Sequence, residues 1–68
     1  MTVLVNGEAR DVAPAVTLSG LLTLLGHDPR GAGLAVAVNG EVVPRGAWAV
    51  TALGERDRID VLGAAQGG

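Results

Sequence analysis

Two β-hairpins are predicted from the way apolar segments alternate with Asn-Gly pairs. In the first, the partly β-branched segment Thr2 to Val5 is followed by Asn6-Gly7, the dipeptide best suited to a type I′ turn, and by an extended segment over Glu8 to Ala13. The second, over residues 34–43, repeats this order with Asn39-Gly40 as its turn. A proline follows each hairpin and ends its second strand, because proline cannot donate to a strand ladder.

A helix is predicted between the two hairpins. Leucines at positions 18, 21, 22 and 25 have the spacing i, i+3, i+4 and i+7, which lines one helix face. Thr17 is placed to cap the first turn through its hydroxyl, and Val16 and Leu21 are spaced as a hydrophobic staple. Gly26 suits a left-handed stop at the C-terminal end. Gly20 is a local weak point, disfavoured by about 1 kcal/mol relative to alanine.

The remaining pattern predicts a last strand over Ile59 to Leu62, with Ile59 and Val61 on one face. Residues 45–48 are expected to form a short helical turn before it, and the last strand is expected to return to the centre of the sheet. This order of elements predicts an α+β domain with a four- to five-stranded mixed sheet and one main helix packed on one face. Residues 1–62 would form the domain, and residues 63–68, which carry no large side chain, a flexible C-terminal tail.

Composition narrows the classes of function. A chain of 68 residues supports a single core, which must be aliphatic because Trp48 is the only aromatic residue. The absence of cysteine excludes disulfides, thiolate catalysis, iron–sulfur ligation and thiolate zinc sites. No segment approaches the roughly 20 apolar residues that span a bilayer, and the first residues lack the pattern of a secretory signal. We therefore expect a cytoplasmic protein with no membrane partner.

Neither the net charge nor the individual side chains indicate a nucleic-acid site or a metal site. A net charge of −2 leaves no basic stripe that could neutralise a phosphate backbone, so nucleic acid is not an expected partner. Trp48 is expected to cover an edge of the core. His27, without a second histidine or a cysteine, is expected at the surface near the helix C-terminus rather than on a metal. Residues 55–58, which alternate in charge, are expected to form a solvated turn, with partner docking as the alternative.

The sequence ends in Gly67-Gly68. Two residues without side chains can lie in a narrow channel and let the catalytic groups of a partner approach the backbone. In a domain without a thiol, any sulfur chemistry would use the backbone, and the carboxyl group of Gly68 is the candidate reagent. That carboxylate is ionised at neutral pH and has no adequate leaving group, so it would have to be activated first.

The whole chain resembles the ThiS family, the sulfur carriers of thiamine thiazole biosynthesis, which have a ubiquitin-like β-grasp fold. The resemblance rests on Val38 to Arg45, on Trp48, and on Asp57 to Ile59 ahead of the terminal diglycine. Its most specific part is Val43-Pro44-Arg45, which follows an Asn-Gly turn and precedes Trp48 by three residues.

Family membership would imply a defined sequence of reactions at Gly68. An adenylating enzyme of the ThiF type would use ATP and magnesium to couple the Gly68 carboxylate to AMP. A persulfide supplied by a cysteine desulfurase would displace AMP and leave a thiocarboxylate, which thiazole synthase of the ThiG type would consume. The chain would bind no cofactor itself and would be a protein co-substrate rather than an enzyme.

Two sets of residues are expected to touch these partners, although solvation alone would also explain the charged residue Asp60. Those expected to thread into partner active sites are Gly67, Gln66 and Ala65. Those expected to form a partner interface are Leu62, Asp60 and Arg58. Gln66 departs from the family pattern, in which small or apolar residues usually precede the diglycine, and Leu62 stands where a larger aromatic residue is frequent.

Other functions fit parts of the same pattern. A carrier of the same fold for molybdopterin synthase, or for another sulfur-transfer route, would share the diglycine, although the segment Val43 to Trp48 favours thiamine. A β-grasp module that binds partners without covalent chemistry would end in glycine by coincidence. Tagging of other proteins, as ubiquitin does, would leave isopeptide bonds on substrates.

Overall fold

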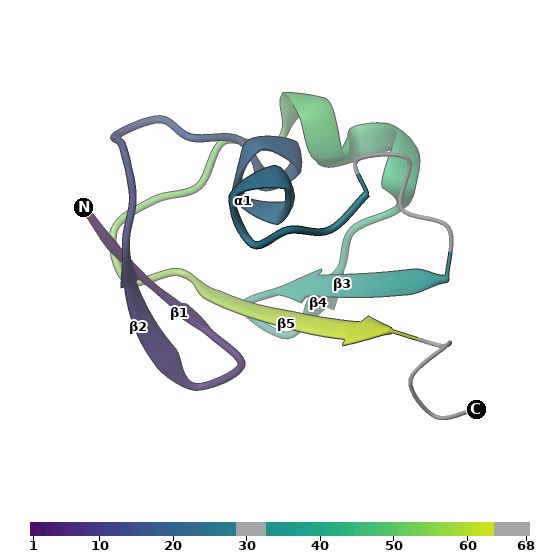
Figure 1. The fold of residues 1–68 in the computed structure, drawn as a ribbon, viewed down its shortest axis with the longest axis horizontal. Helices are drawn as coiled ribbons and strands as arrows, with labels where there is room; N and C mark the ends of the chain where they lie inside the picture. The colour runs from purple at the N-terminus through teal and green to yellow at the C-terminus, as the bar shows by residue number, and fades with distance from the viewer. Residues whose placement is uncertain (29–32, 64–68) are drawn as a thin grey trace.

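The computed structural model describes residues 1–28 and 33–63, which form one five-stranded sheet with one α-helix across one face (Figure 1). The elements in chain order are β1 (Thr2–Val5), β2 (Glu8–Asp11), α1 (Leu18–Leu24), β3 (Leu34–Val38), β4 (Glu41–Val42), the 3-10 helix η1 (Arg45–Val50) and β5 (Arg58–Gly63). The predicted α+β architecture is confirmed, with the short helical turn extended into the six-residue η1.

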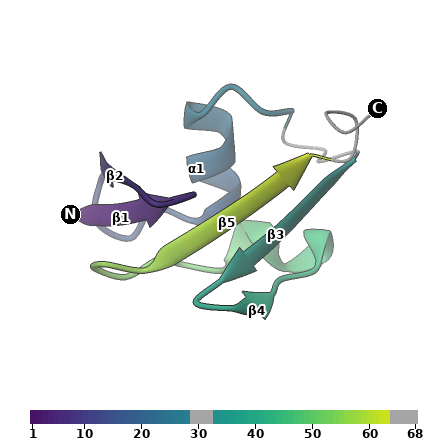
Figure 2. The same cartoon turned by 90° about the horizontal axis from the view of Figure 1, so that it is seen from below.

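Strand β5 lies at the centre of the sheet, as predicted, because the strand order is β2-β1-β5-β3-β4. Figure 2 shows it between β1 and β3. It runs parallel to β1 and antiparallel to β3, which makes the sheet mixed. Its register with β3 extends from the pair Val38 and Ile59 to the pair Leu34 and Gly63. The strand therefore continues through Gly63, one residue beyond the predicted domain boundary, and the rest of the predicted tail lies outside the described residues.

Both Asn-Gly turns are confirmed. The backbone φ is +49° at Asn6 and +86° at Gly7, and +53° at Asn39 and +83° at Gly40, as a type I′ turn requires. The second strands are shorter than predicted. Strand β2 ends two residues before Ala13 because its register pairs Asp11 with Thr2, where β1 begins, and β4 also ends one residue early.

The predicted cap and apolar face of α1 are both present. The Thr17 hydroxyl accepts a hydrogen bond from the Gly20 amide at 3.1 Å. The buried residues of the helix are Leu18, Leu21 and Leu22. Gly26, with φ of +88°, follows the C-terminal cap, as the sequence predicts. A Cβ at Gly20 would lie 3.2 Å from Cγ2 of Val16, so the glycine that weakens the helix also gives the staple valine room.

Replacement of Thr17 by alanine is expected to lower the free energy of unfolding by about 1 kcal/mol, because the Gly20 amide loses its cap. Urea denaturation followed by circular dichroism measures this difference. Thr17→Ser, which keeps the hydroxyl, is the control and should remain near the wild-type value. Equal midpoints for the alanine and serine variants would show that the cap contributes nothing.

The core lies between α1, η1 and the inner face of the sheet. Its buried members are Val3, Val5, Leu18, Leu21, Leu22, Val36, Trp48, Leu53 and Ile59. Trp48 is only 2% exposed, and its indole Nε1 donates to the Val43 carbonyl at 2.8 Å. The prediction that Trp48 covers the core is therefore confirmed. Ile59 and Val61 share the inner face as predicted, with Val61 half-buried.

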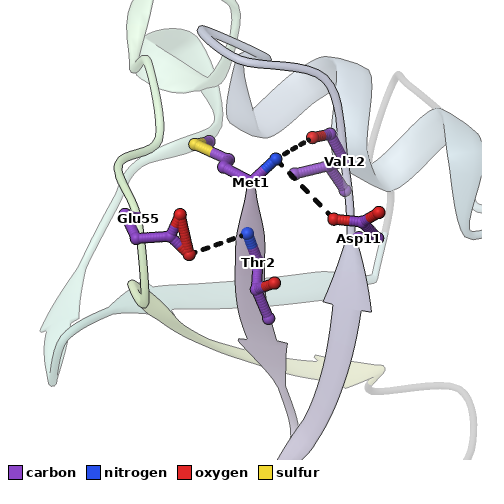
Figure 3. A network of polar contacts seen from close by, with 5 residues as sticks. All are labelled: Met1, Thr2, Asp11, Val12 and Glu55. Carbon is purple, nitrogen blue, oxygen red and sulfur yellow. Dashed lines mark hydrogen bonds and ion pairs between the residues drawn. The ribbon is translucent and has the colours of Figure 1, made fainter.

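The predicted solvated turn before β5 is held to the sheet by its acidic side chains. The Glu55 carboxylate accepts from the Thr2 amide at 2.9 Å, next to Met1, whose amino nitrogen donates to the Val12 carbonyl at 2.8 Å (Figure 3). The Asp57 carboxylate accepts from the Gly54 amide at 2.7 Å and from the side chain of the second hairpin's asparagine at 3.0 Å. Solvation alone was thus an incomplete description, because both carboxylates fix the entry into β5.

Candidate functional site

The face of the sheet opposite α1 is the candidate site, since no helix formed by the described residues lies over this face in either view (Figures 1 and 2). Strand β5 alternates across the sheet, so Arg58, Asp60 and Leu62 project from the outer face while the residues between them face the core. All three are exposed, and Leu62 is 71% exposed. The structure therefore brings the three predicted interface residues together on one strand and one face.

Strands β3 and β4 extend this face with small and apolar residues. The register places Ala35 opposite Leu62, and Ala37 between Asp60 of β5 and Val42 of β4. We call these five residues the outer patch. Its two large apolar side chains are both well exposed, Val42 at 74%. An exposed apolar surface rimmed by charge is typical of a site where another protein binds.

The sequence interpretation missed Val42. The second Asn-Gly turn fixes the register of the hairpin, and that register puts Val42 on the same face as Ala37. Because Ala37 neighbours the buried Val36 along the strand, it must point outward, and Val42 with it. The outward direction of Val42 could therefore have been predicted from the sequence. It follows from the pairing of the second hairpin together with the side of the sheet that the helix covers.

A partly open depression lies beside the first turn. Its lining residues are Leu4, Gly7, Arg58 and Asp60. Leu4 is the Cα partner of Arg58 in the parallel pairing of β1 with β5. The depression therefore combines an apolar side chain with one cation and one anion of β5, a surface suited to polar contacts at the rim of an interface.

The residues predicted to carry the chemistry are Gly68, Gly67, Gln66 and Ala65, and all four lie outside the described residues. The described part of the chain reaches Gly63 at the end of β5, opposite the start of β3. Asp60 and Leu62 of the outer patch therefore lie on the strand whose continuation in sequence carries the predicted reactive residues.

Within residues 1–28 and 33–63, no group of three or more histidine, cysteine or acidic residues is close enough to hold a metal ion. His27 is half-exposed just after α1, and its backbone amide donates to the Leu22 carbonyl at 2.9 Å. That position agrees with the predicted surface location. In the same part of the chain, no helix is long and apolar enough to cross a membrane.

A mixed five-stranded sheet with a central last strand and one helix across one face defines a ubiquitin-like β-grasp domain. The ThiS family model matches residues 3–68, and the chain belongs to the ThiS family. A crystal structure of the thiamine biosynthesis protein ThiS from Geobacter metallireducens is 30% identical, covers 91% of both chains and superposes with a TM-score of 0.81. A solution structure of a thiamine biosynthesis protein from the same organism is also 30% identical. The match covers 91% of this chain and 81% of the chain in that structure, with a TM-score of 0.76.

A relative of a different size carries the same kind of domain. The "thiazole synthase" of Paramagnetospirillum magneticum is 34% identical over all 68 residues of this chain. Those residues span only 20% of the length of that protein. In that relative, a domain similar to this chain therefore belongs to a polypeptide about five times as long, which bears the name of a thiazole-forming enzyme.

Proposed function

We propose that this domain is a sulfur carrier of thiamine biosynthesis that holds sulfur as a thiocarboxylate on Gly68. The observation that carries the proposal is the ThiS family match, which extends over residues 3–68 and so includes the diglycine. The likeness to a crystal structure and a solution structure of a thiamine biosynthesis protein supports the pathway. The thiazole synthase relative favours thiamine over a molybdopterin route.

The proposed chemistry begins with activation by a separate enzyme. The Gly68 carboxylate attacks the α-phosphorus of ATP, pyrophosphate leaves, and the resulting acyl adenylate carries AMP as a leaving group. Magnesium and cationic groups of the adenylating enzyme stabilise the charge that develops on the phosphate. This domain contributes the acyl oxygen and a terminus that fits a narrow site.

Sulfur then replaces AMP. The terminal sulfur of a protein persulfide, derived from cysteine by a desulfurase, forms a bond to the Gly68 carbonyl carbon as the bond to AMP breaks. Two electrons from a thiol reductant cleave the sulfur–sulfur bond and leave the thiocarboxylate. Thiazole synthase takes the sulfur into the thiazole ring: the bond from this sulfur to the Gly68 carbonyl carbon breaks, and an oxygen from the thiazole precursor or from water restores the carboxylate. The domain is consumed and regenerated as a co-substrate, without catalytic residues of its own.

The outer patch, together with Arg58, is the proposed docking surface for these enzymes. Asp60 and Leu62 of this surface, with Arg58, lie on β5, the strand that leads to the reactive residues, so binding here would place those residues near a partner's active site. Exposed Leu62 and Val42 supply apolar contact area, and Arg58 and Asp60 supply a charged rim.

Intact-protein mass spectrometry tests the function directly. The domain is coexpressed with an adenylating enzyme of the ThiF type and a cysteine desulfurase, and its mass is compared with that of the domain expressed alone. A carrier gains the mass of one oxygen-to-sulfur exchange at its C-terminus. An unchanged mass, with an adenylating enzyme shown to be active on another carrier, would contradict the proposal and favour a non-covalent binding module.

Truncation of Leu62 to alanine is expected to raise the KM of the adenylating enzyme for this domain about 5- to 30-fold, as for a central interface residue. The reason is that Leu62 contributes exposed apolar area to the docking surface and nothing to the core. Pyrophosphate release, measured against carrier concentration, gives KM and kcat.

Leu24→Ala is the matched control for this variant. Leu24 is 68% exposed, nearly the same exposed fraction as that of Leu62, but it lies on α1 and not on the outer face of the sheet. Its truncation should leave KM at the wild-type value, and both variants should keep the wild-type thermal midpoint. A KM that rises equally in the two variants, or in neither, would show that the outer patch does not bind the enzyme.

A further inference from the structure

The two turn asparagines do more than form turns, because each replaces a missing backbone hydrogen bond to β5. At the second turn, the Asn39 amide donates to the Arg58 carbonyl at 2.7 Å, as an antiparallel ladder requires. The reciprocal bond is made by the side chain, since the Arg58 amide donates to Oδ1 of Asn39 at 2.9 Å. The positive φ of Asn39 starts the turn, and its carboxamide oxygen takes the place of its own carbonyl.

At the first turn, on the other side of β5, a side chain likewise takes the place of a backbone hydrogen-bonding group. The Asn6 amide donates to the Ile59 carbonyl at 2.9 Å, which continues the parallel pairing of β1 with β5. The Val61 amide then donates to Oδ1 of Asn6 at 2.8 Å, and Nδ2 of Asn6 donates to the Val61 carbonyl at 3.3 Å. One carboxamide therefore bonds both the amide and the carbonyl of Val61, the two groups that backbone atoms would have bonded if β1 had continued.

The two contacts lie at different ends of β5. Asn39 acts at Arg58, where the strand begins, and its Nδ2 also donates to the Asp57 carboxylate at 3.0 Å. Asn6 acts at Val61, next to Leu62 and two residues before the strand ends. Pairing between β1 and β5 ends at Val5 and Ile59. Beyond it, the Asn6 side chain holds the edge of β5 that faces β1, while β3 pairs with the other edge as far as Gly63.

We propose that Asn6 is a positioning residue that fixes the last part of β5 and thereby the point from which the C-terminal residues enter a partner's active site. The inference rests on the proposed carrier function. Backbone order at Val61 keeps Leu62 on the outer face, because a strand that frays or rotates no longer alternates its side chains. Order that is already present in the free domain does not have to be gained on docking, which strengthens binding without new contacts.

Two glycine variants separate this role from turn formation. Asn6→Gly and Asn39→Gly both remove the carboxamide while keeping a residue that readily adopts positive φ, so both hairpins retain suitable turns. Asn39→Gly is the matched control, because it removes bonds at the start of β5 and leaves those at Val61 in place.

The first measurement is amide hydrogen exchange of the full domain by NMR. Asn6→Gly is expected to accelerate exchange at Val61 about 5- to 30-fold, as two hydrogen bonds are lost there. Asn39→Gly is expected to leave exchange at Val61 near the wild-type rate. Unchanged exchange at Val61 in Asn6→Gly would overturn the inference.

The second measurement is pyrophosphate release by the adenylating enzyme. Asn6→Gly is expected to raise the KM for the carrier about 5- to 30-fold with kcat nearly unchanged, because the cost falls on docking and not on the reaction. Asn39→Gly loosens only the charged rim at Arg58 and leaves Val61 in place, so it should raise KM less than Asn6→Gly even where it lowers the thermal midpoint. A wild-type KM for Asn6→Gly, or an equal rise in both variants, overturns the inference. A wild-type domain that is not adenylated contradicts the proposed function instead, and the positioning role falls with it.

Discussion

Deletion of Gly68 is expected to abolish thiocarboxylate formation while leaving the thermal midpoint of the domain nearly unchanged. The deletion leaves a carboxylate on Gly67, but one residue of extended chain spans about 3.3–3.6 Å, so this group stops short of the site where the phosphate is attacked. Reacting atoms must come within about 3–3.5 Å in the right orientation. The buried core comprises residues between 3 and 59, and the deletion touches none of them.

Intact mass after incubation with the adenylating enzyme, ATP, magnesium and a persulfide donor measures sulfur loading, and differential scanning calorimetry measures the midpoint. Gln66→Ala is the control, because it alters a neighbouring side chain and keeps the length of the chain. That variant should still load sulfur. Loading of the Gly68 deletion at a rate near that of the wild-type domain would show that the acceptor lies elsewhere.

The features that the sequence predicts well are those fixed by neighbours along the chain. Each Asn-Gly pair determines its turn through the positive φ of two adjacent residues, and the threonine cap bonds an amide only three residues away. The leucine spacing that predicts the buried face of α1 is likewise local. The order of elements indicated that β5 returns to the centre of the sheet. Only the resemblance to the β-grasp fold made this a prediction of one particular fold.

The polar contacts that hold β5 could not be predicted in this way. Asn6 bonds Val61 across 55 positions of sequence, and Glu55 bonds Thr2 across 53. Nothing in the residues nearby distinguishes an asparagine that only turns the chain from one whose carboxamide also replaces a ladder bond. The alternating charges at 55–58 therefore indicated a solvated turn, although both carboxylates of this segment, Glu55 and Asp57, accept backbone hydrogen bonds.

Strand β5 joins the stability of the domain to its proposed function, since its two faces have different tasks. The inner face contributes Ile59, which is fully buried, and the outer face contributes Leu62, which is mostly exposed. Backbone pairing with β1 and β3 holds both sets in one register. A substitution on one face should therefore affect folding, and a substitution on the other should affect docking.

Ile59→Ala is expected to lower the free energy of unfolding by about 2–5 kcal/mol, through lost transfer energy and the cavity left in the core. A domain of 68 residues has a total stability of roughly 3–10 kcal/mol, so this single change removes much of it. Urea denaturation followed by the fluorescence of buried Trp48 measures the loss. Leu62→Ala, on the opposite face of the same strand, should stay within about 0.5 kcal/mol of wild type. Similar losses in the two variants would mean that β5 is not divided between a core face and a docking face. The expected result is a domain that loads less sulfur because a larger fraction of it is unfolded, although every residue assigned to the chemistry is intact.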